Sequence, residues 1–216
     1  MRLFHSTIGR VQGGQLEAAT AIAGEAAKLI GRHGGDIRFF IAGAAGEEVN
    51  STVFSIEYDS PEALGAGFDE LAADAELQAL MTRVNATASP TVITSQIMGM
   101  EMPIGRIPTR GRGGILEIHA SRINPGRTED AVAEAAQVCE FVEANGAVNA
   151  RLLQLTYAGL GSGMVALSWE HENMRAQARL GAAWFSDAGM ALQARSMSAS
   201  PAMVRVSSAL YTEVPL

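Results

Sequence analysis

Residues 3–14 read LFHSTIGRVQGG, and residues 115–126 read ILEIHASRINPG. Each stretch is strand-like and ends in a turn that contains glycine. The second stretch lies over the first after a shift of 112 positions, and with small slips at loops the agreement continues along the chain, where Tyr58 meets Trp169. Matching turns and matching hydrophobic phase over this length indicate that the chain is a tandem duplication of one unit.

Each copy has the pattern strand, helix, strand, strand, helix, strand. In the first copy, apolar residues recur at helical spacing between residues 16 and 30, and Gly34 ends the pattern. A second helical region opens at Ser60, with proline at the first helical position, and Asp74 can cap the chain again within it. We expect strands at 3–11, 37–42, 52–58 and 90–98, with a hairpin loop at 43–50, and in the second copy at 116–121, 151–157, 164–169 and 201–210.

Four strands and two helices in this order form a ferredoxin-like sheet with both helices on one face. The other face must be buried, and in a duplicated chain the simplest solution packs the two sheets against each other. We therefore predict an α+β fold of two such units. The first unit spans residues 1–101, a linker rich in Gly, Pro and Arg spans residues 102–113, and the second unit spans residues 114–216.

In this pattern the chain resembles the dimeric α+β barrel superfamily. The superfamily includes antibiotic-biosynthesis-type monooxygenases, muconolactone isomerases, polyketide cyclases and NIPSNAP-like proteins and, with haem, chlorite dismutases and aldoxime dehydratases. The resemblance covers nearly the whole chain and rests on the order of the elements, so it implies the fold more than a function. It also implies a homodimer as the state of the protein.

The composition argues against several classes of partner. A net charge of -7 and scattered arginines argue against nucleic-acid binding, which depends on clustered positive charge. No run approaches the roughly 18 apolar residues of a membrane helix. The single cysteine, Cys139, cannot form an internal disulfide, so the sequence predicts a cytoplasmic protein whose partner is a small molecule.

We expect no metal ion and no cofactor. The four histidines are dispersed along the sequence, which argues against a dedicated metal site. The haem proteins of the resembling superfamily need an axial ligand, usually a histidine on a helix, and neither predicted helix of the second copy supplies one. The glycine-rich residues 159–163 connect two strands and do not open a helix, so they do not indicate a phosphate-binding loop.

The first strand of the second copy alternates between apolar and polar residues. We expect its apolar side chains to meet the helices and its polar side chains to face the space between the sheets, where members of the resembling superfamily commonly place reactive groups. The apolar side chains are Leu116, Ile118 and Ala120. The polar side chains are Glu117, His119 and Ser121, matched in the first copy by His5, Thr7 and Gly9.

The last strand adds Arg205 where the first copy has Thr94, so only the second copy combines a Glu, a His and an Arg. A histidine in a mostly apolar cleft can act as a general base or acid near neutral pH. Glu117 or Arg205 could orient it or stabilise an oxyanion. The predicted catalytic residues are His119, Glu117 and Arg205. In the alternative interpretation, His119 is an interior histidine with satisfied hydrogen bonds, and Glu117 and Arg205 form an ion pair that ties the barrel together.

Six further side chains are candidates for contact with a substrate. Tyr157 and Trp169 could form an aromatic wall, although an aromatic residue at a strand end is more often part of the core. His171 follows a strand beside two glutamates, so it could contact the substrate or lie at the rim of the sheet. The predicted set is His5, Thr7, Ser121, Tyr157, Trp169 and His171.

Three functions are consistent with these residues. The one we favour is a cofactor-independent enzyme of lyase, isomerase or cyclase type that moves protons on a hydrophobic, aromatic and oxygenated small molecule bound in the barrel cavity. The second is a cofactor-free monooxygenase of the antibiotic-biosynthesis type, in which the substrate carbanion activates oxygen. The third is a protein that binds a small molecule or assembles without catalysis, which predicts an interior closed by side chains and no pocket that contains a histidine.

Overall fold

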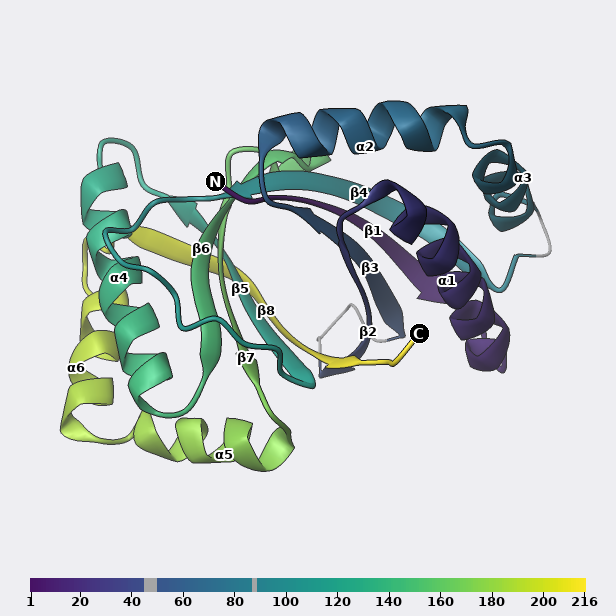
Figure 1. Ribbon diagram of the computed structural model, residues 1–216. Coiled ribbons are helices and arrows are strands. Elements are labelled where there is room, and N and C mark those ends of the chain that lie inside the picture. Colours follow the sequence, from purple (N-terminus) through teal and green to yellow (C-terminus); the bar gives the residue numbers. More distant parts are fainter. Residues whose placement is uncertain (45–49, 87–88) are drawn as a thin grey trace.

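A closed barrel of strands forms the centre of the molecule (Figure 1). The computed structural model describes residues 1–44, 50–86 and 89–216, so most of the predicted hairpin loop at 43–50 lies outside the described residues. The strands are β1 (Leu3–Val11), β2 (Asp36–Ala44), β3 (Ser51–Tyr58), β4 (Thr91–Glu101), β5 (Ile115–Ile123), β6 (Val148–Tyr157), β7 (Val165–His171) and β8 (Met203–Glu213). They follow one another around the barrel in the order β1-β3-β2-β8-β5-β7-β6-β4, and the neighbours are antiparallel.

The helices are α1 (Leu16–Ile30), α2 (Pro61–Ala73), α3 (Ala75–Val84), α4 (Thr128–Ala144), α5 (Met174–Ala183) and α6 (Asp187–Ser196). Ser60 begins α2, because its Oγ accepts a hydrogen bond from the backbone N–H of Ala63 at 3.1 Å. Asp74 ends α2 and caps α3, because its Oδ1 accepts from the N–H of Leu77 at 3.0 Å. The second helical region therefore divides at Asp74, as the sequence predicts.

The two copies each contribute one four-stranded sheet, which confirms the predicted fold. The first copy forms β4-β1-β3-β2, the second forms β8-β5-β7-β6, and the sheets join where β2 pairs with β8 and β4 pairs with β6. Helices α1, α2 and α3 cover the outside of one sheet, and α4, α5 and α6 cover the outside of the other (Figure 1). Residues 102–113, which connect the two copies along the chain, form neither helix nor strand. The predicted domain limits stay a prediction.

Apolar side chains from both copies fill the inside of the barrel. Phe40, Val53 and Tyr211 form a buried cluster there, and Leu116 and Ile118 pack against it. The alternating side chains of β5 therefore point the opposite way from the predicted one. The apolar residues of this strand face the inside of the barrel, and they do not face the helices.

The polar side chains of β5 face the helices instead, where Glu117, His119 and Ser121 line a cavity. The prediction that they face the space between the sheets is wrong, and the cavity that they line lies outside the barrel. Side chains just fill the inside of an eight-stranded barrel. Both faces of each strand are covered, one by the opposite sheet and one by helices, so alternation separates the two faces without showing which one is inside.

A charged network closes one end of the barrel interior and connects the two copies. Arg38 on β2 donates from Nη1 to Glu170 Oε1 on β7 at 2.6 Å and from Nη2 to Glu213 Oε2 on β8 at 2.7 Å. Glu170 also accepts from Asn149 Nδ2 at 2.8 Å and from the N–H of Gly113 at 2.7 Å. We call these five residues the barrel-end network. Every oxygen of the buried Glu170 carboxylate is satisfied by this network.

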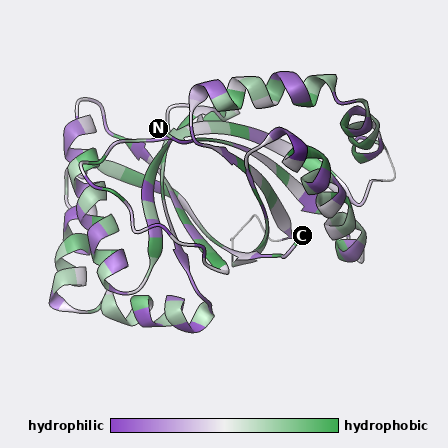
Figure 2. Cartoon of the chain, in the orientation of Figure 1, coloured by the Kyte–Doolittle hydropathy of each residue, from purple (hydrophilic) through white to green (hydrophobic). Residues whose placement is uncertain are grey.

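Among the described residues, no helix is long and apolar enough to cross a membrane. Figure 2 shows that the helices mix hydrophilic and hydrophobic residues along their length, as helices do when one side packs on a sheet and the other meets water. The predicted cytoplasmic location stays a prediction.

Candidate functional site

A cavity of about 510 Å³ lies in the second copy between the outer face of the sheet and helices α4, α5 and α6. We call it the second-copy pocket. Strands β5, β7 and β8 supply most of its polar side chains, and the helices add apolar ones together with Glu134, Gln193 and Ser196. Its lining includes Glu117, His119, Ser121, Trp169, Trp184 and Arg205. The structure thus brings together five of the nine predicted site residues, including all three predicted catalytic ones.

Glu117 accepts hydrogen bonds from three ring N–H groups. Its Oε1 accepts from His119 Nε2 at 2.9 Å, and its Oε2 accepts from His171 Nε2 at 3.0 Å and from Trp169 Nε1 at 3.2 Å. Burial alone would raise the pKa of this carboxyl, but the hydrogen bonds from His119 and His171 outweigh burial and lower the pKa to about 2. Glu117 is therefore a carboxylate at neutral pH.

His119 is held between this carboxylate and a hydroxyl. Because the ionised Glu117 can only accept, Nε2 of His119 carries a proton and donates it. In the neutral ring Nδ1 is then the basic atom, and the hydroxyl of Ser208 donates to it over 2.7 Å. The imidazole also packs on the indole of Trp169, with 4.8 Å between ring centres. These contacts fix both the tautomer and the orientation of His119, which is what a general base requires.

Arg205 reaches the same pocket because of a β-bulge. The register between β5 and β8 shifts after Ala120, which places Ser207 opposite Ala120 and Arg205 opposite Ser121. Among the described residues, Arg205 forms no hydrogen bond or ion pair. The alternative in which it forms an ion pair with Glu117 is therefore wrong. The exposed guanidinium is available to a ligand.

The bulge also changes which residues of the two copies are equivalent. Strands β1 and β4 have a matching shift after Ile8, which places Ile93 opposite Gly9. The counterpart of Arg205 in the first copy is therefore Ile93, and the predicted match with Thr94 is wrong by one residue. In a strand such a slip exchanges the two faces of the sheet.

His171 lies behind Glu117 and not at a rim. It pairs with Ile115 just as Tyr58 pairs with Leu3, so His171 and not Trp169 is the counterpart of Tyr58. Its side chain is 1% exposed and contributes its Nε2–H to Glu117. His171 does not line the second-copy pocket. Its burial shows that the interpretation as a rim residue is wrong, and contact with a substrate stays a prediction. Its role in the structure is to position the carboxylate.

Three further residues differ from the prediction. Tyr157 is 73% exposed at the end of β6 and lies outside the pocket, so the predicted aromatic wall contains Trp169 without it. Ser208, which binds His119, was not among the predicted residues. Its position opposite His119 depends on the bulge in β8, and a bulge adds one residue without a clear mark in the sequence. Trp184 was also missed, because the second helical regions of the two copies align poorly in sequence.

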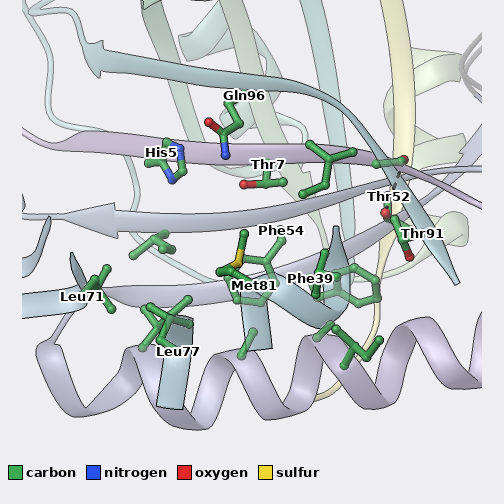
Figure 3. Close-up of a pocket in the computed structure, with 18 of the residues that line it drawn as sticks. His5, Thr7, Phe39, Thr52, Phe54, Leu71, Leu77, Met81, Thr91 and Gln96 are labelled. Atoms are coloured by element: carbon green, nitrogen blue, oxygen red, sulfur yellow. Dashed lines mark hydrogen bonds between the residues drawn. The ribbon is translucent and has the colours of Figure 1, made fainter. Parts of the chain in front are cut away.

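His5 and Thr7 line a different cavity, of about 330 Å³, between the first-copy sheet and helices α1, α2 and α3 (Figure 3). We call it the first-copy pocket. The two sets of helices that line these pockets lie on opposite outer sides of the barrel (Figure 1). His5 and Thr7 therefore cannot contact a substrate together with His119, as the single predicted set required.

The side chains of the second-copy pocket do not suit a metal ion or a haem group. Within residues 1–44, 50–86 and 89–216, no group of three or more His, Cys, Asp or Glu side chains is placed to hold a metal ion. Helices α4, α5 and α6 contain no histidine, and both ring nitrogens of His119 are hydrogen-bonded to protein groups. None of these residues is therefore suited to be the axial ligand of a haem iron. The expected independence from a cofactor stays a prediction.

No protein-family model and no curated protein matches this sequence. Solved structures do resemble it. A proposed monooxygenase from Fusobacterium nucleatum superposes with a TM-score of 0.64 at 8% identity, over 99% of this chain and 93% of that one. An anthrone oxidase-like protein gives a TM-score of 0.57 at 13% identity over 99% and 92%. A mutant chlorite dismutase from Candidatus Nitrospira defluvii gives 0.58 at 10% identity over 99% and 92%.

At these identities the similarity concerns the fold and not the reaction. It extends over nearly the full length of each chain, including both copies of the unit. The sequence repeat, the closed barrel and these neighbours together show that the chain has the ferredoxin-like fold of the dimeric α+β barrel superfamily.

Proposed function

We propose that the protein is a cofactor-independent enzyme that moves a proton on a hydrophobic, aromatic and oxygenated small molecule bound in the second-copy pocket. The observation that carries the proposal is the chain of hydrogen bonds from Glu117 through His119 to Ser208, of which Glu117 and His119 line this pocket. A buried carboxylate that fixes one nitrogen of a histidine leaves the other nitrogen as a base of defined direction.

Glu117, His119 and Arg205 each have a role in such a reaction. The hydroxyl of Ser208 would turn away from His119 Nδ1. This nitrogen would then accept a proton from a carbon next to a carbonyl group, and the Glu117 carboxylate would stabilise the imidazolium that forms. The guanidinium of Arg205 would bind the oxygen on which negative charge develops. Trp169 and Trp184 would hold the aromatic part of the substrate. A proton returned to a different atom completes an isomerisation, and loss of a leaving group completes an elimination.

A second candidate function is a cofactor-free monooxygenase, because solved structures with the same fold include proposed monooxygenases and an anthrone oxidase-like protein. It uses the same first step. The carbanion formed when His119 takes the proton would transfer an electron to dioxygen and then combine with it. For anthrone the balanced reaction consumes one dioxygen and yields anthraquinone and one water. Neither proposed reaction requires a bound metal ion or an organic cofactor.

Anthrone is a suitable probe, because its methylene protons are acidic and its rings are apolar. We expect the protein to accelerate exchange of these protons with deuterium from the solvent under nitrogen, as followed by NMR. In air, an oxygen electrode separates the two enzyme functions, since only the monooxygenase consumes dioxygen in step with anthraquinone formation. Binding of anthrone without exchange and without oxygen uptake would overturn both and favour the third function, a non-catalytic binding protein.

We also propose that the protein is a homodimer. Val204 and Val206 are 48% and 55% exposed on β8, and this part of β8 pairs only with β5 among the described residues. A second copy could cover these side chains. Light scattering should give twice the 22.7 kDa mass of one chain, and the double variant Val204→Lys with Val206→Lys should give the mass of one chain. A wild-type mass of one chain contradicts this proposal.

A further inference from the structure

The two pockets are built from equivalent positions of the duplicated chain. Helix α1 begins at Leu16 and α4 begins at Thr128, 112 positions later, so Ala26 on α1 corresponds to Val138 on α4. Both of these side chains line their own pocket. Strand residues also correspond, because Thr7 opposes Gln96 in the register where His119 opposes Ser208. The pockets therefore have the same architecture and can be compared position by position.

The comparison shows that the first-copy pocket lacks the charges of the second. The side chains that can ionise in the second-copy pocket are Glu117, His119, Glu134 and Arg205. The equivalent positions of the first-copy pocket hold His5, Thr7, Ile22 and Ile93. His5 is thus the single ionisable side chain in that lining, and burial lowers its pKa, so its ring is neutral at pH 7. A charged ligand would find no opposite charge in this cavity, and burial of an unpaired charge is costly.

Three polar side chains gather on the sheet side of the first-copy pocket. Figure 3 shows His5, Thr7 and Gln96 near one another on the strands, across from Leu77 and Met81. In the part of the chain that the structure describes, the side chains of these three polar residues form no hydrogen bond with protein groups. They can therefore donate to or accept from a group on a ligand.

Apart from Thr52, Gln78 and Thr91, the rest of the lining is apolar, and it is rich in aromatic rings. Phe39, Phe54 and Phe68 line the cavity, and the ring of Phe68 meets the ring of His5 edge to face at 5.2 Å. Aromatic rings prefer such edge contacts and offset stacking with other rings. A volume of about 330 Å³ is at the lower end of the range of small-molecule sites. The volume and the lining side chains of the first-copy pocket thus suit one compact aromatic molecule.

We propose that the first-copy pocket is a second binding site, separate from the proposed catalytic pocket, which takes an uncharged aromatic molecule that carries one hydroxyl or carbonyl group. The oxygen of the ligand lies at His5, Thr7 and Gln96, and its rings lie among the phenylalanines and the helix side chains. The site binds without chemistry, because it has no base paired with a carboxylate. This inference does not depend on the proposed function of the other pocket.

The test uses 2-naphthol, which is uncharged at pH 7, and two matched variants of the full chain. Ala26→Phe places a benzyl group in the first-copy pocket, and Val138→Phe places the same group at the equivalent point of the second-copy pocket. By titration calorimetry we expect Ala26→Phe to raise the Kd of the first-copy site at least tenfold. Val138→Phe should leave that Kd within threefold. Loss of all 2-naphthol binding in Val138→Phe, or unchanged binding in Ala26→Phe, overturns the proposal.

The charge preference is measured on the Val138→Phe variant, so that the second-copy pocket does not contribute. We expect 2-naphthoate, which has the same rings and a negative charge, to bind at least tenfold more weakly than 2-naphthol. Equal binding of the two compounds overturns the proposal for an uncharged ligand.

A second variant keeps the proposal testable if Ala26→Phe does not fold. The double substitution Thr7→Val with Gln96→Leu removes two polar groups with little change of volume. This double variant should raise the Kd of 2-naphthol at least fivefold and leave the Kd of naphthalene unchanged, because only the hydroxyl group of the ligand loses its hydrogen-bond partners. Equal binding of 2-naphthol to this variant and to the wild type contradicts the assignment of the polar end, and circular dichroism confirms that each variant is folded.

Discussion

Replacing Glu170 with alanine is expected to lower the free energy of unfolding by about 3–5 kcal/mol, the range for breaking a buried charge pair. Glu170 is 1% exposed and accepts from Arg38, Asn149 and the N–H of Gly113. Without the carboxylate, the buried guanidinium of Arg38 keeps only Glu213 as a charged partner in this network. Two other donors lose their acceptor in a place that water reaches poorly.

The measurement for Glu170 is urea unfolding followed by circular dichroism. Glu172 provides a matched control, because it lies two residues further along and is exposed. Its substitution by alanine should change the free energy of unfolding by no more than about 0.5 kcal/mol. A loss below about 1 kcal/mol for Glu170→Ala would show that the barrel-end network does not hold the two copies together.

Replacing His119 with glutamine is expected to slow the proton exchange of anthrone by roughly 100-fold to 10,000-fold, the usual contribution of a positioned general base. The amide of glutamine can still donate to Glu117, so the buried carboxylate keeps a partner and the fold is retained. Glutamine cannot take up a proton at neutral pH. The loss should therefore appear in the rate of exchange, with a smaller change in the binding of anthrone.

The control for His119 is the same substitution at His33. The ring of His33 forms hydrogen bonds with Glu70 and Asp74 in the first copy, and it lies outside both pockets. His33→Gln should exchange anthrone protons at the wild-type rate. An exchange rate for His119→Gln within threefold of the wild type would rule out His119 as the base, even if the Glu117 hydrogen bonds remain.

The fold was predictable because the features that specify it are local and repeated. Proline and glycine at turns mark the same element order in both copies, and Ser60 and Asp74 add helix caps in the first copy. The structure has those elements. A bare face on each predicted sheet then required a partner sheet. These arguments need only spacing and residue type, which a sequence contains.

The orientation of the strands and the details of the site were not predictable in the same way. Leu116 and Glu117 lie on opposite faces of β5, but each face is covered by other parts of the molecule, so burial alone could not assign them. The positions of Arg205 and Ser208 depend on a one-residue bulge. The place of Tyr157 depends on where β6 ends, and strand ends are set by tertiary pairing.

Both sheets of the barrel belong to a single chain, and this affects how the protein can evolve. In a symmetric pair of identical subunits, every mutation alters both halves at once. Here Arg205 can be gained while Ile93 stays apolar, since the two positions are encoded separately. Selection can therefore act on one cavity while the other keeps its chemistry, and a single gene can acquire two different specificities.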